Sequence, residues 1–154
     1  MKKKYLFLPF IIVLLLFIIF LSSCFQQPIA TSGSITSFSY EYGSYFPGYF
    51  QYDIVKDNGR YQLSIQGYND KAVNVSKQIS VSDVDRLAKI INQYQIYQWN
   101  GFNQEDKGVM DGDGFTLHIV YEDGSIIDAH GYMKYPNNYR EGHNKICSFF
   151  EHYY

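Results

Sequence analysis

The chain has 154 residues, enough for one domain with a real hydrophobic core. Aromatic residues make up 19% of it, which argues against an ordinary disordered chain, and two cysteines are too few for a disulfide framework. The formal net charge is −2 and becomes −5 without the three amino-terminal lysines, because ten basic residues then face 15 acidic ones. This acidic balance argues against a nucleic-acid partner, which would need a basic patch.

The amino terminus has the order of a secretory signal. Lys2–Lys4 precede an apolar run of 17 residues, Tyr5–Leu21, and two serines and a cysteine follow. Leu21–Cys24 (Leu-Ser-Ser-Cys) resembles the lipobox of bacterial lipoproteins. The resemblance implies that residues 1–23 are a signal peptide and that Cys24 is the lipidated first residue of the mature protein. It therefore implies a protein anchored in the cell membrane through lipid chains.

An uncleaved signal anchor is the alternative, because the apolar run is longer than the usual hydrophobic region of a signal peptide. As a helix it would extend roughly 25 Å, slightly less than the ~30 Å hydrocarbon core. Both hypotheses place the domain outside the cytoplasm, since the three lysines keep the amino terminus on the cytoplasmic side of the membrane. A lipidated Cys24 could not form an intrachain disulfide with Cys147. We expect Cys147 to behave as a small buried apolar residue.

Residues 24–34 are polar and small, and we expect them to form a flexible tether to a single domain at residues 35–154. Alternating aromatic and polar residues predict strands over 38–42 and 50–54. Asn58-Gly59 is a strong hairpin signal, since a type I′ turn needs positive φ at both positions. A two-residue loop there predicts apolar pairs, namely Ile54 with Leu63 and Tyr52 with Ile65. A further strand is expected over 73–79.

Two amphipathic helices are expected. The first covers Ser82–Gln95, with Ser82 as its cap and Asp85 at the third position. Its expected buried stripe is Val84, Leu87, Ala88 and Ile91. The second covers about Asn138–Tyr153, and its buried face is Ile146, Phe149, Phe150 and Tyr153. His143 and His152 are expected at the surface of this last helix. Between the helices, Ile96–Asp113 is expected to be a long connection.

A second hairpin joins strands over 115–121 and 126–132, and two registers are open. A two-residue loop at Asp123-Gly124 would place Asp128 and His130 on the face of the apolar residues. A three-residue loop that includes Glu122 instead pairs Ile119 with Ile127 and Leu117 with Ala129. We favour the three-residue loop because it buries apolar residues together.

The predicted order is therefore ββββαββα. This order predicts an α+β fold, an antiparallel sheet of about six strands with two helices packed on one face. Three segments, Trp99–Phe102, Asp111–Leu117 and Gly131–Pro136, are similar to a family of bacterial lipoproteins of unknown function. This resemblance implies no activity, so it supplies no catalytic residues.

Three side chains are candidate metal ligands. The favoured register places His118, Asp128 and His130 on one strand face, and imidazole and carboxylate groups are the ligands that zinc takes. The alternative is an ordinary polar face in contact with solvent. A second set of candidates is aromatic: Trp99, Phe102, Tyr132 and Tyr135 lie in or near loops, where they would either contact a ligand or close the core.

These patterns predict a lipid-anchored envelope protein that presents a small binding or structural domain outside the membrane. We expect no catalysis and no cofactor, because no nucleophile elbow or phosphate-binding loop is present in the sequence. The expected partners are the membrane, through the lipid, and an envelope protein or a cell-wall glycan. The alternatives are a small metal-dependent enzyme that uses His118, Asp128 and His130, and an inhibitor or immunity-type lipoprotein.

Overall fold

The computed structural model describes residues 33–44, 46, 48–68 and 72–154. The expected signal peptide, Cys24 and residues 24–32 of the expected tether lie outside the described residues. Within the described part of the chain, no helix has both the length and the apolar character needed to cross a membrane.

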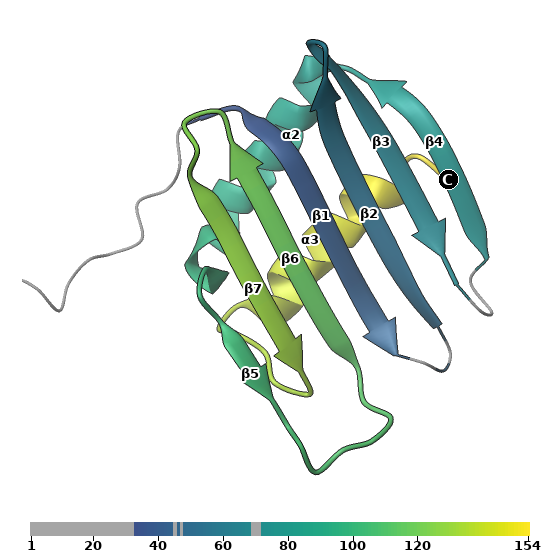
Figure 1. Cartoon of the computed structure of the whole chain (residues 1–154), viewed down its shortest axis with the longest axis vertical. Helices are drawn as coiled ribbons and strands as arrows, with labels where there is room; N and C mark the ends of the chain where they lie inside the picture. The colour runs from purple at the N-terminus through teal and green to yellow at the C-terminus, as the bar shows by residue number, and fades with distance from the viewer. Residues whose placement is uncertain (1–32, 45, 47, 69–71) are drawn as a thin grey trace, which may run out of the picture.

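The fold is a seven-stranded sheet, antiparallel except at one edge (Figure 1). The strands lie in the order β4-β3-β2-β1-β6-β7-β5. Their bounds are β1 (Ile35–Ser44), β2 (Gly48–Asp57), β3 (Arg60–Gly67), β4 (Val73–Ile79), β5 (Asn103–Glu105), β6 (Gly114–Tyr121) and β7 (Ile126–Tyr132). The amino-terminal strand β1 is therefore at the centre, paired with β6 from the second half of the chain.

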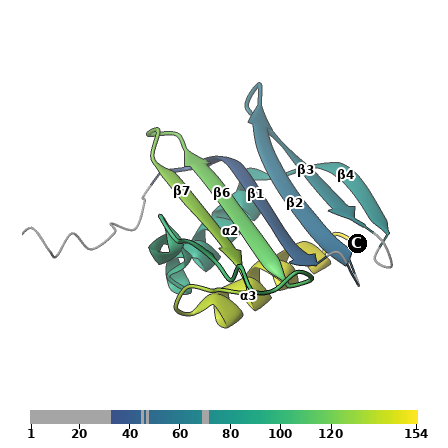
Figure 2. The ribbon, with the colours of Figure 1, turned by 60° about the horizontal axis from the view of Figure 1, so that its bottom comes forward.

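Both α-helices lie on one face of the sheet (Figures 1 and 2). They are α2 (Val81–Gln93) and α3 (Tyr139–Glu151), and the short 3-10 helix η2 (Ile96–Trp99) follows α2. The opposite face carries none of the described helices, and we call it the open face. The α+β class and the helices on one side are thus confirmed.

The sheet has one strand more than the sequence predicted. β5 lies inside the segment Ile96–Asp113, which was expected to be a connection, and pairs in parallel with β7. The backbone N–H of His130 donates to the carbonyl of Phe102 at 2.8 Å, which begins this pairing. All three residues of β5 are exposed and polar, so no apolar alternation marks them in the sequence.

Both predicted hairpin registers are confirmed. In the first, Ile54 pairs with Leu63 and Tyr52 with Ile65, and φ is 48° at Asn58 and 77° at Gly59, as a type I′ turn requires. In the second, the three-residue loop is present: Ile119 pairs with Ile127 and Leu117 with Ala129, and Gly124 has φ 82°.

Helix α2 begins earlier than predicted, and its cap is Ser80 rather than Ser82. The backbone N–H of Asp83 donates to the Ser80 hydroxyl at 3.2 Å, and the Ser80 N–H donates to the Asp83 carboxylate at 3.1 Å. This reciprocal capping box satisfies two backbone donors, which the predicted pair of Ser82 and Asp85 does not do. The predicted stripe is buried at Val84, Leu87 and Ile91, whereas Ala88 is half-buried.

The core lies between the sheet and the two helices, and aromatic rings dominate its centre. Phe150 of α3 stacks on Tyr52 with 4.3 Å between ring centroids and on Phe38 with 5.5 Å. Ile146 and Phe149 are also buried, as predicted, and Tyr153 is half-buried. Cys147 is 8% exposed, so its prediction as a small buried residue is confirmed.

His143 corrects a prediction, because it is half-buried rather than at the surface. Its Nδ1 lies 2.7 Å from the hydroxyl of Tyr40, and its ring packs edge-on against Tyr42 at 4.6 Å. The aromatic face of β1 thus binds α3 through a polar contact as well as through packing. His152 is exposed, as predicted.

Candidate functional site

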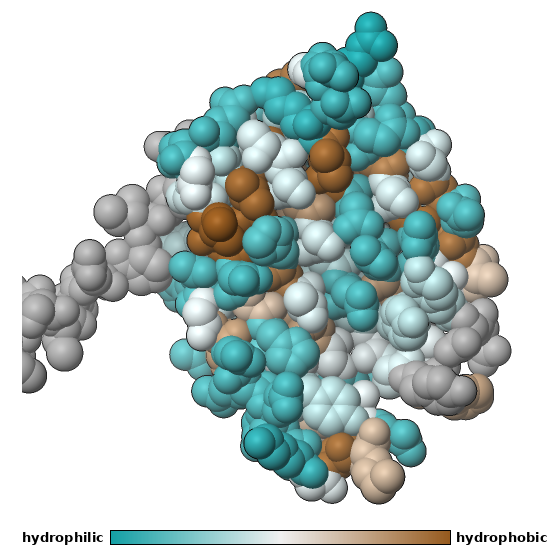
Figure 3. All heavy atoms as spheres, viewed as in Figure 1, coloured by the Kyte–Doolittle hydropathy of each residue, from teal (hydrophilic) through white to brown (hydrophobic). Residues whose placement is uncertain are grey.

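The open face is polar over most of its area. Outward positions on the central strands carry serine, threonine, glutamine and charged residues, and Figure 3 shows mainly hydrophilic and neutral side chains there. Aliphatic residues are exposed toward one end, where Val55 is 48% and Ile126 is 49% exposed. The opposite end, where β1 ends and β6 begins, has a different composition.

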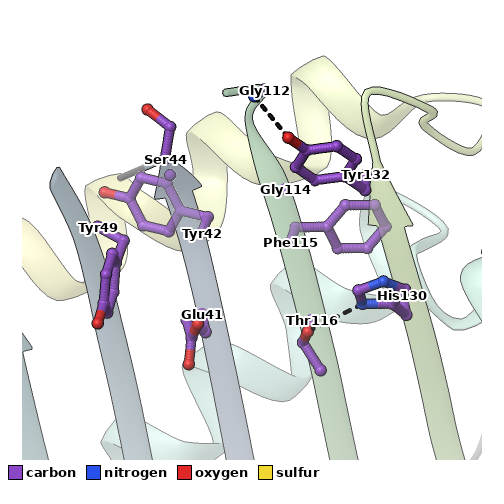
Figure 4. Close-up of a pocket in the computed structure, with 11 residues that line it drawn as sticks. Glu41, Tyr42, Ser44, Tyr49, Gly112, Gly114, Phe115, Thr116, His130 and Tyr132 are labelled. Atoms are coloured by element: carbon purple, nitrogen blue, oxygen red, sulfur yellow. Dashed lines mark hydrogen bonds between the residues drawn. The ribbon is translucent and has the colours of Figure 1, made fainter. Parts of the chain in front are cut away.

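At that end two glycines lie side by side. Gly43 of β1 pairs with Gly114 of β6, while the neighbouring outward positions are Tyr49 on β2 and Tyr132 on β7. A hollow of about 260 Å³ lies here (Figure 4), and we call it the glycine groove. Its lining is Glu41, Tyr42, Gly43, Ser44, Tyr49, Gly112, Gly114, Phe115, Thr116, His130 and Tyr132.

Local backbone geometry explains why the groove has a glycine floor. Gly43 has φ +126°, and a Cβ there would lie only 2.5 Å from the carbonyl oxygen of Gly48. A Cβ on Gly114 would lie 3.2 Å from the carbonyl oxygen of Gly131 and 3.4 Å from Cδ2 of Tyr132. Glycine is therefore required at position 43, where a side chain would collide with the neighbouring strand, and favoured at position 114.

The tyrosines beside the floor are each held by a neighbour. The hydroxyl of Tyr132 accepts a hydrogen bond from the N–H of Gly112 at 2.6 Å, as drawn in Figure 4. The ring of Tyr49 packs against that of Tyr68 with 4.8 Å between centroids. Both Tyr49 and Tyr132 are half-buried, so each side chain combines fixed orientation with accessible ring surface.

The polar side of the groove contains hydroxyl, imidazole and carboxylate groups. Thr116 Oγ1 lies 3.2 Å from His130 Nδ1, and His130 Nε2 lies 3.3 Å from a carboxylate oxygen of Glu105. Glu41 is the cross-strand partner of Thr116. Among the described residues that line the groove, none is lysine or arginine. The groove therefore suits a neutral ligand with hydroxyl groups better than an anion.

A second hollow, of about 240 Å³, lies at the same end of β1 and β6 but toward α3. It shares Tyr42, Gly43, Ser44 and Gly114 with the glycine groove. Its aromatic wall is a stack in which Tyr135 packs on Tyr139 at 4.5 Å and Tyr139 packs on His143 at 5.4 Å.

Behind this wall, tyrosine hydroxyls form hydrogen-bonded groups. The hydroxyl of Tyr52 lies 3.0 Å from that of Tyr42 and 3.2 Å from that of Tyr154, and the hydroxyl of Tyr40 lies 3.2 Å from that of Tyr139. Burial raises the pKa of Tyr40 and Tyr52 well above the ordinary value of 10.0. These phenols stay protonated at neutral pH, so they act here as a scaffold.

The predicted metal ligands make separate contacts. His118 Nδ1 lies 3.2 Å from a carboxylate oxygen of Asp128, as the register predicted. His130 instead contacts Thr116 and Glu105. Across the described part of the chain, no group of three or more histidine, cysteine, aspartate or glutamate side chains could hold a metal ion. The three residues therefore give the metal-dependent alternative no support.

The four aromatic candidates have different places in the fold. Trp99 is 1% exposed and packs against Phe115 and Tyr139, so the structure removes it from the candidate contact residues. Phe102 is half-buried and stacks on Phe115. Tyr135 lines the second hollow, and only Tyr132 lines the glycine groove.

Sequence reasoning missed Tyr49, Glu41 and the glycine pair. Gly43 and Gly114 each lie one residue outside a predicted strand, 38–42 or 115–121, so the alternating pattern did not place them on the sheet. No protein-family model matches the chain, and no curated protein matches it either. The geometry of the groove is therefore the basis for assigning a function.

Proposed function

We propose that this protein is a lipid-anchored binding protein of the cell envelope, and that its glycine groove holds a section of cell-wall glycan. The lipobox-like segment Leu21–Cys24 supports the anchor, because lipidation at Cys24 would hold the domain on the outer side of the cytoplasmic membrane. The domain needs no catalytic group for this role.

The paired glycines between two tyrosines are the observation that carries the proposal. A sugar ring has an apolar face, which packs on an aromatic ring, and an edge of hydroxyl groups. The groove supplies both complements, because Tyr49 and Tyr132 flank the floor and polar side chains lie beside it. Glu41, Thr116 and His130 provide acceptors and donors for hydroxyl groups.

Charge supports a neutral glycan over an anionic ligand. Glu41 lines the groove and the carboxylate of Glu105 contacts His130, so these groups make the electrostatic potential there negative. A phosphate or a nucleic acid would meet repulsion there, without the guanidinium or ammonium groups that normally pair with it.

Isothermal titration of the full chain in detergent with soluble glycan fragments tests this function. We expect Tyr49→Ala and Tyr132→Ala to weaken binding about tenfold, equivalent to about 1.4 kcal/mol. Val55→Ala and Ile126→Ala are matched controls. Val55 lies on β2 with Tyr49 and Ile126 lies on β7 with Tyr132, on the same face of the sheet but away from the groove. Equal affinities in all four variants, or binding of free stem peptides alone, would contradict the proposal.

A further inference from the structure

We infer that the glycine groove is one part of a longer site, which crosses the strands and takes a glycan polymer rather than a single sugar. This inference rests on the proposed function and names the form of its ligand. The observation behind it is a row of outward positions that continues past the groove to Tyr68, just after β3, where a further hollow extends to β4.

The row follows hydrogen-bonded neighbours from one strand to the next. It starts at Tyr132, passes the paired glycines and Tyr49, and reaches Tyr68, whose N–H donates to the carbonyl of Tyr49 at 3.0 Å. Neighbouring strands are ~4.8 Å apart, so four steps cover roughly 19 Å. The row is thus longer than the groove alone, and its direction is perpendicular to the strands.

A further hollow, of about 380 Å³, lies at the far end of this row. Gln66, Tyr68 and Asn74 supply its polar lining, and Gln66 of β3 is the cross-strand partner of Asn74 of β4. The hydroxyl of Tyr68 donates to the Gln66 side chain, which holds ring and amide together. Amide groups both donate and accept, so they suit the hydroxyl and acetamido groups of sugars.

The tyrosine pair lies between the two hollows. The rings of Tyr49 and Tyr68 are 4.8 Å apart at an angle of 32°. Tyr49 lines the glycine groove and Tyr68 lines the far hollow, so the pair forms an aromatic ridge that touches both. Successive units of one polymer would occupy the two hollows and pack on the ridge between them. Such a ligand gains contacts as its length increases.

The dependence of affinity on oligomer length tests this inference. Full-length protein in detergent is titrated with chito-oligosaccharides from the dimer to the hexamer. We expect the hexamer to bind at least about tenfold more tightly than the dimer. Asn74→Ala should remove this gain and leave dimer affinity nearly unchanged, whereas Tyr68→Ala should remove the gain and also weaken dimer binding, because its ring packs on Tyr49. Asn74→Ala is the cleaner variant, because Asn74 is exposed and its cross-strand partner is Gln66.

Each outcome has a distinct meaning. Equal affinity for dimer and hexamer, with binding still weakened in Tyr132→Ala, would overturn the inference and leave the proposed function standing. A length dependence that Asn74→Ala and Tyr68→Ala do not change would also overturn it, because the extra units would then bind elsewhere. Absence of binding at every length would overturn both proposals.

Discussion

Gly43 of β1 and Gly114 of β6 are direct cross-strand partners at the end of the two central strands. Strand β1 belongs to the first half of the chain and β6 to the second, so the floor of the groove exists only when the sheet is complete. The groove can therefore bind a ligand only in the folded protein. The two glycines should respond differently to substitution, because a Cβ would meet a 2.5 Å contact at Gly43 and a 3.2 Å contact at Gly114.

Gly114→Ala should weaken glycan binding more than it weakens the fold. The added methyl group would narrow the floor beside Tyr132, and Gly114 does not have the positive φ that strains alanine. We expect about tenfold weaker binding, measured by titration calorimetry. The melting temperature should fall less than in Gly43→Ala, because the closest contact of the new Cβ is 3.2 Å, to the carbonyl oxygen of Gly131. Unchanged affinity in a folded variant would show that ligand does not reach the floor.

Gly43→Ala should instead destabilise the fold. Its Cβ would lie 2.5 Å from the carbonyl oxygen of Gly48 and 2.7 Å from Cα of Tyr49, at φ +126°. Overpacking and backbone strain of this kind cost about 1–3 kcal/mol, which urea unfolding would measure. Gly59→Ala is the matched control, since φ is +77° there but the space is open. An equal loss in both variants would show that φ strain alone is responsible.

Ser80→Ala should lower the free energy of unfolding by about 1 kcal/mol, because it removes the cap of α2. Ser82→Ala should cost less, since the hydroxyl of Ser82 contacts that of Ser80 and caps no backbone group in the described helix. Chemical unfolding of the two variants measures the difference. Equal losses, or a larger loss from Ser82→Ala, would disagree with the observed capping box.

The same cap should give α2 a measurable acid dependence. Hydrogen bonds from Ser80 lower the pKa of Asp83 below its ordinary value of 3.8. The contribution of Asp83 to stability is therefore complete above that ordinary value and disappears as pH falls through the folded-state pKa. Unfolding measured at descending pH should show a smaller acid loss in Asp83→Asn than in the wild type. Parallel curves would rule out this link.

Alkaline pH should destabilise the core through its tyrosines. Burial raises the pKa of Tyr40 and Tyr52, so in the folded state these groups hold their protons above pH 10.0, where the unfolded chain loses them. Their contribution to stability is full below the unfolded pKa and falls as pH increases beyond it. Ultraviolet titration should show these phenols ionising together with unfolding. Their ionisation while the fold stays intact would contradict the assignment.

Much of the fold could be predicted because its signals are local. Asn58-Gly59 fixes a turn, and the apolar pairing of Ile119 with Ile127 chooses between two loop lengths. β5 had no such signal, because its three side chains are all polar and exposed and show no alternation. Its pairing with β7 depends on backbone hydrogen bonds. Ser80 and Ser82 are both suitable caps by sequence, and only backbone geometry distinguishes them.

The groove could not be predicted because four strand ends combine to form it. Tyr49, Gly43, Gly114 and Tyr132 become neighbours through the strand order β2-β1-β6-β7. Strands β1 and β6 are far apart in the sequence, so no turn between them predicts their pairing, whereas each hairpin has such a turn. Tyr132 was a candidate because it lies near a loop, whereas Tyr49 lies one residue before the strand predicted over 50–54 and has no such signal.

Backbone amide mapping by NMR, with isotope-labelled full-length protein in detergent and soluble glycan fragments, tests the central claim most directly. Binding in the groove predicts shifts concentrated at Gly43, Gly114 and Thr116, with small changes at the aliphatic end near Val55 and Ile126. Shifts centred on Val55 and Ile126, or no shifts at any glycan concentration, would contradict the assignment of the groove as the binding site.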